Sequence, residues 1–381
     1  MSRTSETDGG AGGMSIPAEL AGATLTIDLA ALAANWRTVR DEVAPAECGA
    51  TIKADGYGCG TVEVARALWD AGCRTFFVAL PMEGKLVRET LPDAVIYVLD
   101  GLFAGQSAFY IEHDLRPALA SPEEIAEWAE ATGGKYKAAM HVDTGINRLG
   151  LTRPQAEALA ADEGLMERAG LCLLMSHLQS GDDASDAMNA TQLERFAALR
   201  KLFPALRASL ANSPGSFLGK AFAQDLARPG VALYGGNPFA DKPNPFRPVV
   251  RLVAQVLQVR DVAAGEGVGY SATWTADRPS RIAIIGAGYA DGINRHLSWP
   301  AHDGPAEVVI AGVKCPVVGR VSMDMITVDV TGLDAGTVKR GTQAVLLGDG
   351  ISVDDWARWA GTIPYEILTS LGRRYAKVYS S

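Results

Sequence analysis

The sequence predicts an α/β domain followed by a β-rich domain, and three observations support this prediction. From Ala23 to Ala211, short apolar runs alternate with amphipathic segments. The proline-rich segment Asn244–Pro248 interrupts this alternation, and many short alternating runs with turn residues follow it. Strands that alternate with helices are typical of a (β/α)8 barrel or a doubly wound sheet, whereas closely spaced short strands are typical of an all-β domain. Periodicity alone leaves the choice between barrel and open sheet unresolved.

The predicted strands of the first domain are short apolar runs bounded by polar or turn residues. In chain order they are Ala23–Leu29, Cys48–Ala54, Thr75–Leu80, Ala94–Asp100, Tyr136–Val142, Leu171–His177 and Ala208–Ala211. The predicted helices between them are amphipathic: Ala31–Val43, Thr61–Ala71, Glu83–Thr90, Ser121–Thr132, Pro154–Ala161 and Ala190–Phe203. One of these helices has a complete start signal, since Ser121 can cap it, Pro122 suits its first position and Glu124 completes a capping box.

The second domain is predicted from short runs with two-residue alternation. These runs are Val249–Val259, Arg281–Ile285, Ala306–Ile310, Lys314–Val318, Ile326–Val330 and Gln343–Gly348, with one helix at Ser352–Ala360. We therefore divide the chain into a flexible N-terminal tail over residues 1–20, an α/β domain over 21–247 and a β-rich domain over 248–381.

Composition and charge indicate an ordinary soluble protein that acts on small molecules or other protein chains. The chain has 381 residues, of which 48% are hydrophobic and 21% charged, which argues against disorder or a fibre. Its net charge of -9 leaves no general basic surface for nucleic acid.

The cysteines and the apolar runs indicate a cytoplasmic protein. The 5 cysteines are scattered without a CxxC pair, so we expect neither a disulfide framework nor a zinc site. The first residues lack the apolar core of a signal peptide, and no apolar run approaches the roughly 20 residues that span a bilayer. We expect no membrane contact.

Several polar residues follow predicted strands at the point where each strand ends. Lys53 and His177 end two of the runs, Asn212-Ser213 follow a third, and Arg148 lies in the segment after Val142. Arg228 precedes a Pro-Gly pair later in the chain. Each alone is an ordinary strand end, turn or ion-pair residue. Catalytic groups of barrels lie at the C-terminal ends of strands, so their joint placement predicts a site.

The residue types at these positions indicate a Schiff-base cofactor. A lysine near apolar and cationic neighbours has a lowered pKa, which makes its amine a nucleophile. Asn212, Ser213 and the backbone at Gly230 come late in the barrel order, where barrels commonly bind phosphate. A lysine and a phosphate site together predict pyridoxal phosphate. A cofactor-free lysine aldolase is an alternative, while dinucleotide and P-loop motifs are absent.

At these residues the sequence resembles the alanine racemases. The cofactor-lysine motif is matched by Thr51 through Gly60, and further matches are Val142–Gly145, Arg228–Gly235, Gly269–Trp274, Gly288–Gly292, Gly319–Asp324 and Tyr365–Leu368. The resemblance covers nearly the whole chain beyond the first twenty or so residues. It implies a (β/α)8 barrel over 21–247, a mostly β C-terminal domain and a homodimer with shared active sites. It also implies racemisation of alanine, which supplies D-alanine for peptidoglycan or D-alanine metabolism.

The resemblance further implies the roles of individual residues. Lys53 and Tyr270 would be the two bases, with Tyr270 delivered by the partner subunit. Arg228 would hydrogen-bond the pyridine nitrogen, and His177 would tune the second base through it. The cofactor phosphate would be bound by Tyr57, Ser213, Gly230, Val231 and Tyr365. Arg148 would lie near the cofactor's phenolic oxygen and the substrate carboxylate. The substrate would also meet Tyr289, Met323 and Asp324, and the channel to the site would be lined by Tyr289, Arg295, Arg320, Asp324 and Ile363.

The sequence departs from the family at His141. The family often has a carbamylated lysine there that orients the arginine matched by Arg148, and histidine cannot carry a carbamate. We therefore expect another acid or an anion to orient Arg148. Three alternatives stay open: a racemase of serine or other amino acids, a decarboxylase of the same fold type, and a regulatory or carrier barrel. The decarboxylases pair the pyridine nitrogen with a carboxylate, and carrier barrels lack a second domain.

Overall fold

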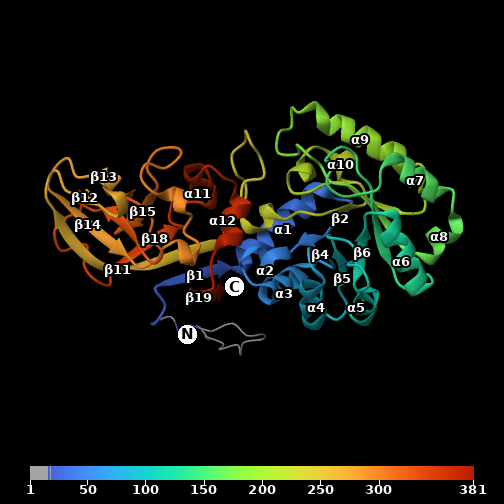
Figure 1. Cartoon of the computed structure of the whole chain (residues 1–381), viewed down its shortest axis with the longest axis horizontal. Helices are drawn as coiled ribbons and strands as arrows, with labels where there is room; N and C mark the ends of the chain where they lie inside the picture. Colours follow the sequence, from blue (N-terminus) through green and yellow to red (C-terminus); the bar gives the residue numbers. More distant parts are fainter. Residues whose placement is uncertain (1–15, 18) are drawn as a thin grey trace. The chain divides into compact units, whose positions relative to one another are not determined.

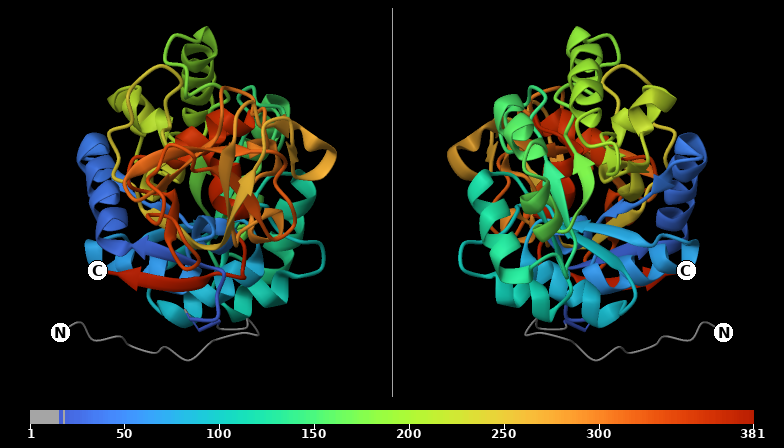
Figure 2. Two further views of the ribbon diagram at one scale, coloured as in Figure 1. Left: turned by 90° about the vertical axis from the view of Figure 1, so that its left-hand side faces the viewer. Right: turned by 90° about the vertical axis from the view of Figure 1, so that its right-hand side faces the viewer.

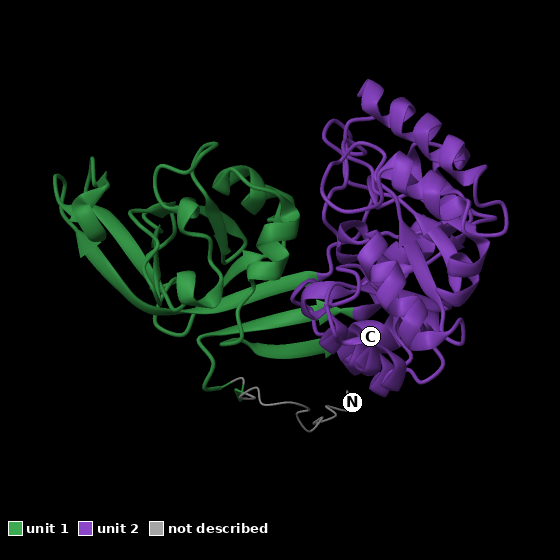
Figure 3. Cartoon of the chain, turned by 45° about the vertical axis from the view of Figure 1, so that its right-hand side comes forward, with its two compact units in different colours: residues 1–28, 250–381 green, residues 29–249 purple. Residues whose placement is uncertain are grey.

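The computed structural model describes residues 16–17 and 19–381, which form two compact units (Figures 1 and 3). The barrel unit is Leu29–Val249, and the β unit joins the described residues up to Asp28 with Val250–Ser381. Most of the predicted tail, residues 1–15 and 18, lies outside the described residues. None of the described helices has the length and apolar character needed to cross a membrane.

The barrel unit contains parallel strands in consecutive order, as the alternation of strands and helices predicts. Seven described strands form one sheet in the order β3-β4-β5-β6-β7-β8-β9, and β10 pairs in parallel with β2. Backbone bonds from Arg228 to Ala211 (2.9 Å) and from Gly49 to Ala227 (2.9 Å) join β10 to its two neighbours. The structure thereby confirms the predicted barrel, with helices outside the strands (Figure 2, right).

The strands of the barrel unit are β2 (Glu47–Cys48), β3 (Ala50–Thr51), β4 (Thr75–Val78), β5 (Val95–Val98), β6 (Arg116–Leu119), β7 (Ala138–His141), β8 (Leu171–Met175), β9 (Arg207–Ser209) and β10 (Leu226–Ala227). Its helices are α1 (Leu29–Val43), α2 (Lys53–Tyr57), α3 (Thr61–Ala71), α4 (Pro81–Thr90), α5 (Ser107–Glu112), α6 (Pro122–Thr132), α7 (Arg153–Ala160), α8 (Glu163–Arg168), α9 (Ala187–Arg200) and α10 (Lys220–Ala223), with short 3-10 turns η1 (Pro214–Phe217) and η2 (Val231–Tyr234).

Alternate strand residues fill the inside of the barrel, which is a packed core rather than a pore. One buried cluster is contributed by β4 to β8 and β10: Phe77, Tyr97, Ala118, Ala139, Leu173, Met175 and Leu226. Outside the strands, α6 begins as its sequence predicts, because the Ser121 hydroxyl accepts a hydrogen bond from the Glu124 N–H (3.2 Å). The core thus leaves the strand ends free to carry a site.

The β unit is built on an eight-stranded sheet in the order β14-β17-β16-β15-β18-β11-β1-β19. Its strands are β1 (Ala23–Asp28), β11 (Val250–Val262), β12 (Gly267–Val268), β13 (Trp274–Thr275), β14 (Ser280–Ile285), β15 (Glu307–Ile310), β16 (Val313–Val318), β17 (Ile326–Asp329), β18 (Gln343–Leu347) and β19 (Ala376–Ser380). Its helices are α11 (Val353–Ala360) and α12 (Pro364–Ser370), with 3-10 turns η3 (Tyr270–Ala272), η4 (Tyr289–Asp291) and η5 (Arg295–Leu297).

The first strand differs from the sequence prediction, which placed Ala23–Leu29 in the α/β domain. The structure pairs β1 antiparallel with β11 and parallel with β19, so it belongs to the β unit. The physical reason is its alternation: Leu25 and Ile27 are buried, whereas Thr24 and Thr26 are half-buried. Such alternation suits a sheet with one covered face, while barrel strands covered on both faces have continuous apolar runs.

Candidate functional site

The C-terminal ends of the barrel strands carry the polar residues that the sequence singles out. Lys53 follows β3, His141 ends β7, and Ser209 ends β9. Parallel registry sets His141 beside Met175 and Met175 beside Ser209, so these strand ends are level. His177 comes two residues after the end of β8, and Arg228 comes directly after β10. Lys53, His177 and Arg228 therefore lie at the C-terminal edge of the barrel strands, where the sequence places them.

Lys53 opens a strained left-handed turn. The next four residues, Ala54–Tyr57, have φ angles of 55°, 54°, 58° and 54°. Left-handed backbone costs about 1–2 kcal/mol for each non-glycine residue. Glu83 holds the turn in place, because one carboxylate oxygen accepts the Ala54 N–H (2.7 Å) and the other accepts the Ala79 N–H (2.8 Å). Strain of this kind persists where the surroundings enforce it, which is typical of functional sites.

The Lys53 amine is poised to lose its proton more readily than an ordinary lysine. Burial lowers its pKa; nearby Asp100 opposes this effect and Arg148 adds to it. A larger fraction of the amine is therefore neutral, and neutral amine is the form that attacks a carbonyl or removes a proton.

Arg228 is a buried cation that is held by neutral groups. Its Nη1 donates to the Ser209 hydroxyl (2.5 Å) and its Nη2 donates to the Ser176 carbonyl (2.6 Å). Its guanidinium also lies 5.9 Å from the centre of the Phe77 ring. Burial lowers the pKa of Arg228 to about 10, and no described carboxylate forms an ion pair with it. At neutral pH it therefore stays a positively charged hydrogen-bond donor.

Two histidines beside the arginines are neutral. Burial, then Arg228 and Arg148, lower the pKa of His141 to about 4, and the same causes lower the pKa of His177 to about 3. Both ring nitrogens of His141 are buried without a hydrogen-bond partner. With Lys53, Arg148 and Arg228, the strand ends combine three basic side chains with two neutral imidazoles, a set that favours an anionic ligand.

The acid expected to orient Arg148 is not found among the described residues, because none of their carboxylates pairs with its guanidinium. The segment that carries Arg148 is instead ordered through its backbone. The Asp143 carboxylate accepts the N–H groups of Gly145 (2.9 Å) and Asn147 (3.2 Å).

The neutral histidines predict how stability depends on pH. An unfolded histidine is protonated below about pH 6.5, whereas folded His141 and His177 stay neutral to about pH 4 and about pH 3. The unfolded state binds more protons in this window, so the free energy of unfolding falls as pH drops below about 7, by at most about 1.4 kcal/mol per pH unit for each histidine. Urea unfolding between about pH 7.5 and about pH 5 measures this slope. His141→Gln should flatten it, and the exposed His296→Gln should not; equal slopes in all three proteins would contradict the prediction.

A cradle of backbone N–H groups forms where the sequence predicts phosphate binding. The Ser213 hydroxyl accepts the N–H groups of Gly230 (2.8 Å) and Ala232 (3.4 Å). Tyr57 packs beside them, stacked on Tyr234 with ring centres 4.4 Å apart. A Cβ at position 230 would lie 2.3 Å from the Tyr57 hydroxyl, so only glycine lets this hydroxyl approach the backbone at position 230.

The neighbouring residues of the cradle have different roles. Val231 is fully buried and begins η2. The Asn212 side chain accepts the Gly215 N–H (3.0 Å), so its observed contact shapes the turn that presents Ser213. No contact in the structure supports a cofactor role for Asn212, which stays a prediction.

In the β unit, Tyr270 lies at the tip of the β12–β13 hairpin. Its side chain is 71% exposed. The two residues after it have positive φ angles, 61° at Ser271 and 44° at Ala272. An exposed aromatic ring on a strained turn is typical of a residue that acts on a ligand or a partner chain.

The other predicted residues of the β unit lie on two loops that are tied together. The Tyr289 N–H donates to the Ser322 carbonyl (3.0 Å), and the next residue donates to the Met323 carbonyl. Arg374 bridges the loops, because it binds Asp291 (2.7 Å) and Asp324 (2.9 Å). Met323 and Tyr289 are exposed. Tyr365 is partly buried near the start of α12.

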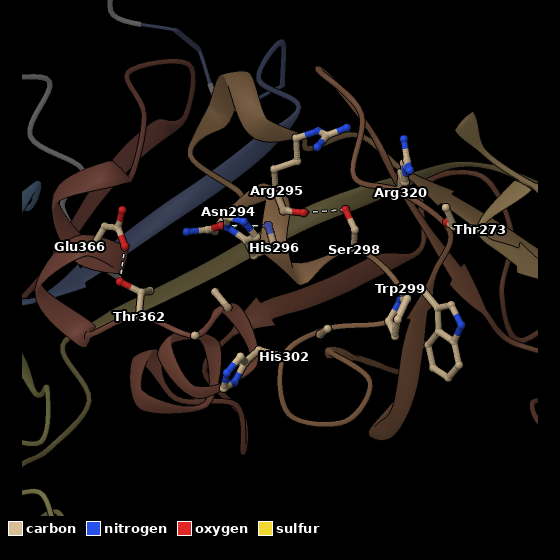
Figure 4. Close-up of a pocket in the computed structure, with 14 residues that line it drawn as sticks. Thr273, Asn294, Arg295, His296, Ser298, Trp299, His302, Arg320, Thr362 and Glu366 are labelled. Carbon is tan, nitrogen blue, oxygen red and sulfur yellow. Dashed lines mark hydrogen bonds between the residues drawn. The ribbon is translucent and has the colours of Figure 1, made fainter. Parts of the chain in front are cut away.

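A pocket of about 720 Å³ opens within the β unit (Figure 4). It contains two residues of the predicted channel, Arg295 and Arg320. Its wall is ordered by short bonds, such as the one from the Ser298 hydroxyl to the Arg295 carbonyl (2.5 Å). Other residues that line it are Thr273, His296, Trp299, His302, Thr362 and Glu366.

The structure thus gathers the predicted residues into two groups, one on each unit. The barrel unit holds Lys53, Tyr57, His141, Arg148, His177, Asn212, Ser213, Arg228, Gly230 and Val231, and the β unit holds Tyr270, Tyr289, Met323, Asp324 and Tyr365. The sequence interpretation missed Ser176, Ser209 and Glu83. The two serines could have been predicted as site residues, since each follows an apolar run at the end of a strand. Glu83 gave no such signal, because its position is that of an ordinary residue in the first turn of α4.

Comparison with known proteins gives a consistent result along the whole chain. The family model for the alanine racemase N-terminal domain matches residues 27–238, and the one for the C-terminal domain matches residues 249–379. An alanine racemase of Methylobacterium nodulans is 53% identical over 361 residues, which cover 94% of this chain and 96% of that one. One from Brucella abortus is 45% identical over 376 residues and 94% of both chains. A crystal structure of alanine racemase from Bartonella henselae with covalently bound pyridoxal phosphate matches with a TM-score of 0.89 and 41% identity, over 94% of this chain and 100% of that one. The chain belongs to the alanine racemase family.

Proposed function

We propose that this protein interconverts L- and D-alanine with pyridoxal phosphate as its cofactor. The observation that carries the proposal is the Lys53 amine, which has a lowered pKa and lies at the same barrel edge as Arg228 and the cradle at Gly230. The proposal agrees with the names of the relatives and with the cofactor bound in the Bartonella henselae protein.

The residues of the barrel unit fit this cofactor. Lys53 would hold its aldehyde carbon, Ser213 and Gly230 with Tyr57 and Val231 would hold its phosphate, and Arg228 would face its ring nitrogen. The fit is supported by the Gly230 backbone, which the Tyr57 hydroxyl approaches closely because position 230 has no Cβ, and by the cations Lys53, Arg148 and Arg228 near His177, which suit an anionic cofactor. When bound, pyridoxal phosphate withdraws electrons from an amino acid and acidifies its α-proton.

Arg228 would limit that withdrawal of electrons. Its guanidinium keeps its proton even with a pKa of about 10, so it can donate a hydrogen bond without protonating its partner. A ring nitrogen that stays unprotonated is a weaker electron sink, which favours return of the proton over decarboxylation and transamination. A decarboxylase would need a carboxylate here, and the groups that hold Arg228 are the hydroxyl of Ser209 and the carbonyl of Ser176.

Two bases on opposite faces of the substrate would invert it without turning it over. Lys53 would move the proton on one face and Tyr270 the proton on the other. We further propose that Tyr270 comes from a second copy of the chain in a homodimer. The exposed side chains of Tyr270, Met323 and Tyr289 in the β unit support an interface there.

The substrate carboxylate would be bound by Arg148, with Met323 and Asp324 as further contacts and Tyr289 in the channel. Purified protein tests this function directly. We expect visible absorbance from bound cofactor and loss of optical rotation to zero from L-alanine and from D-alanine alike. Alanine should react faster than serine, lysine and arginine in a panel of L-amino acids. Colourless protein that gains no activity with added pyridoxal phosphate would refute the proposal, as would release of carbon dioxide.

Gly230→Ala should weaken cofactor binding. The added methyl group would overlap the Tyr57 hydroxyl, and Tyr57 is fixed by its stack on Tyr234. We expect about tenfold or greater loss of pyridoxal-phosphate affinity, equivalent to about 1.4 kcal/mol, measured by absorbance titration of resolved protein. Gly332→Ala is the matched control, because nothing lies within 4 Å of its Cβ and its φ angle is outside the left-handed region. If the overlap is the cause, the double variant Gly230→Ala, Tyr57→Phe should bind the cofactor about as well as Tyr57→Phe alone, because the hydroxyl that the methyl group would overlap is absent from both.

A further inference from the structure

Gln192 is a fully buried glutamine on α9 that hydrogen-bonds two loops of the candidate site. Its Nε2 donates to the Thr144 hydroxyl (3.0 Å) and to the His177 carbonyl (2.9 Å), and its Oε1 accepts the Gln179 N–H (2.7 Å). Thr144 lies in the segment between β7 and Arg148, while His177 and Gln179 follow β8.

The chemistry of these partners fixes the orientation of the amide. A backbone carbonyl only accepts and a backbone N–H only donates. Turning the Gln192 amide over would set its NH₂ against the Gln179 N–H and its oxygen against the His177 carbonyl. The side chain is therefore locked in one orientation, and no buried polar atom of it is left unsatisfied.

The network continues from Gln192 to Arg228. The hydroxyls of Thr144 and Ser176 are 2.8 Å apart, and the Ser176 carbonyl accepts the Arg228 guanidinium. Thr144, Ser176 and Gln192 are each at most 1% exposed. A second residue of α9 supports the same loop, because Arg195 donates to the Thr144 carbonyl (2.9 Å).

This hydrogen-bond network can orient Arg148, which His141 cannot do because histidine does not carry a carbamate. No described carboxylate orients the Arg148 guanidinium, so the position of Arg148 depends on the loop that carries it. We propose that Gln192 is a positioning residue, which sets the Arg148 loop and the His177 segment in register with each other and with Arg228. The inference rests on the proposed racemase function. It adds a residue of α9 that orients the site residues without lying among them.

Two variants test the role of Gln192. Gln192→Met keeps the length of the side chain and removes all its hydrogen bonds. Gln192→Glu keeps the shape and the acceptor for Gln179 but loses the donors, and a buried glutamic acid regains one donor when it is protonated at lower pH. Glu194→Gln, on the exposed face of the same helix, is the control.

Both variants should lower kcat/KM for alanine by about tenfold to a hundredfold, the cost of a displacement near 1 Å in a site. The KM should rise together with the Kd of propionate, which has the carboxylate and methyl group of alanine but no amine and is followed by calorimetry. The loss in Gln192→Glu should shrink as pH falls from 8.5 to about 6, whereas the loss in Gln192→Met should not depend on pH.

The inference would be overturned if folded Gln192→Glu at high pH had the same kcat, KM and propionate Kd as the wild-type protein, even if its unfolding temperature were lower. Equal pH profiles for the two variants would overturn it as well. If Gln192→Met does not fold, the pH dependence of Gln192→Glu carries the test. A wild-type protein that does not racemise alanine would refute the proposed function itself, which distinguishes the two failures.

Discussion

Replacing Lys53 with alanine is expected to abolish racemisation and to remove the cofactor absorbance from the purified protein. The substitution removes both the amine that would hold pyridoxal phosphate and one of the two bases. Loss of a general base alone costs about 10²- to 10⁴-fold in rate, and loss of the amine that holds the cofactor adds to this. Racemisation is measured by chiral chromatography, and the visible spectrum is recorded on the same sample.

The fold should survive this substitution, because the Lys53 side chain forms no hydrogen bond or ion pair with the described residues. Loss of activity would then not result from unfolding. Its lowered pKa shows that burial works against its charged form. Alanine at position 53 should therefore leave the unfolding temperature of the apoprotein equal or higher. The exposed Lys201→Ala is the control and should retain both colour and activity. A coloured Lys53→Ala protein with racemase activity would exclude the proposed linkage.

Much of this site could be predicted because parallel strands impose a common edge. A residue that follows an apolar strand in a barrel has its position fixed by the register, as with Lys53 after β3 and His141 at the end of β7. Other elements were missed for local reasons. β6 contains Pro117, which argues against a strand, yet the barrel order places Arg116–Leu119 between β5 and β7.

Contacts between distant segments could not be predicted from the sequence, for a different reason. Gln192 lies on a polar stretch of α9, and only the packing of that helix brings its amide to the Thr144 and His177 segments. Likewise, four successive left-handed residues after Lys53 have no signature beyond Gly56, because the strain is imposed by Glu83 on α4. Tertiary contacts determine these features, and local propensity does not.

Tyr270→Phe should leave the cofactor in place and remove most of the turnover. The phenyl ring keeps the shape of the hairpin tip but cannot exchange a proton, so we expect racemisation to fall by about 10²- to 10⁴-fold. Lys53 would still exchange the α-proton of one enantiomer with solvent. In D₂O, proton NMR should show that enantiomer gaining deuterium without inversion, while the other stays unlabelled. Tyr379→Phe, on β19 of the same unit, is the control.

Mixing the two inactive proteins distinguishes a Tyr270 that acts in its own subunit from one that acts in the partner. In a dimer of one Lys53→Ala and one Tyr270→Phe chain, shared sites would leave one site with both defects and the other with Lys53 and Tyr270 intact. Statistical exchange of subunits should then restore about a quarter of wild-type activity. If both bases come from one chain, every site keeps a defect and the mixture stays inactive. Restoration would therefore require the exposed hairpin tip to reach the barrel edge of the second copy.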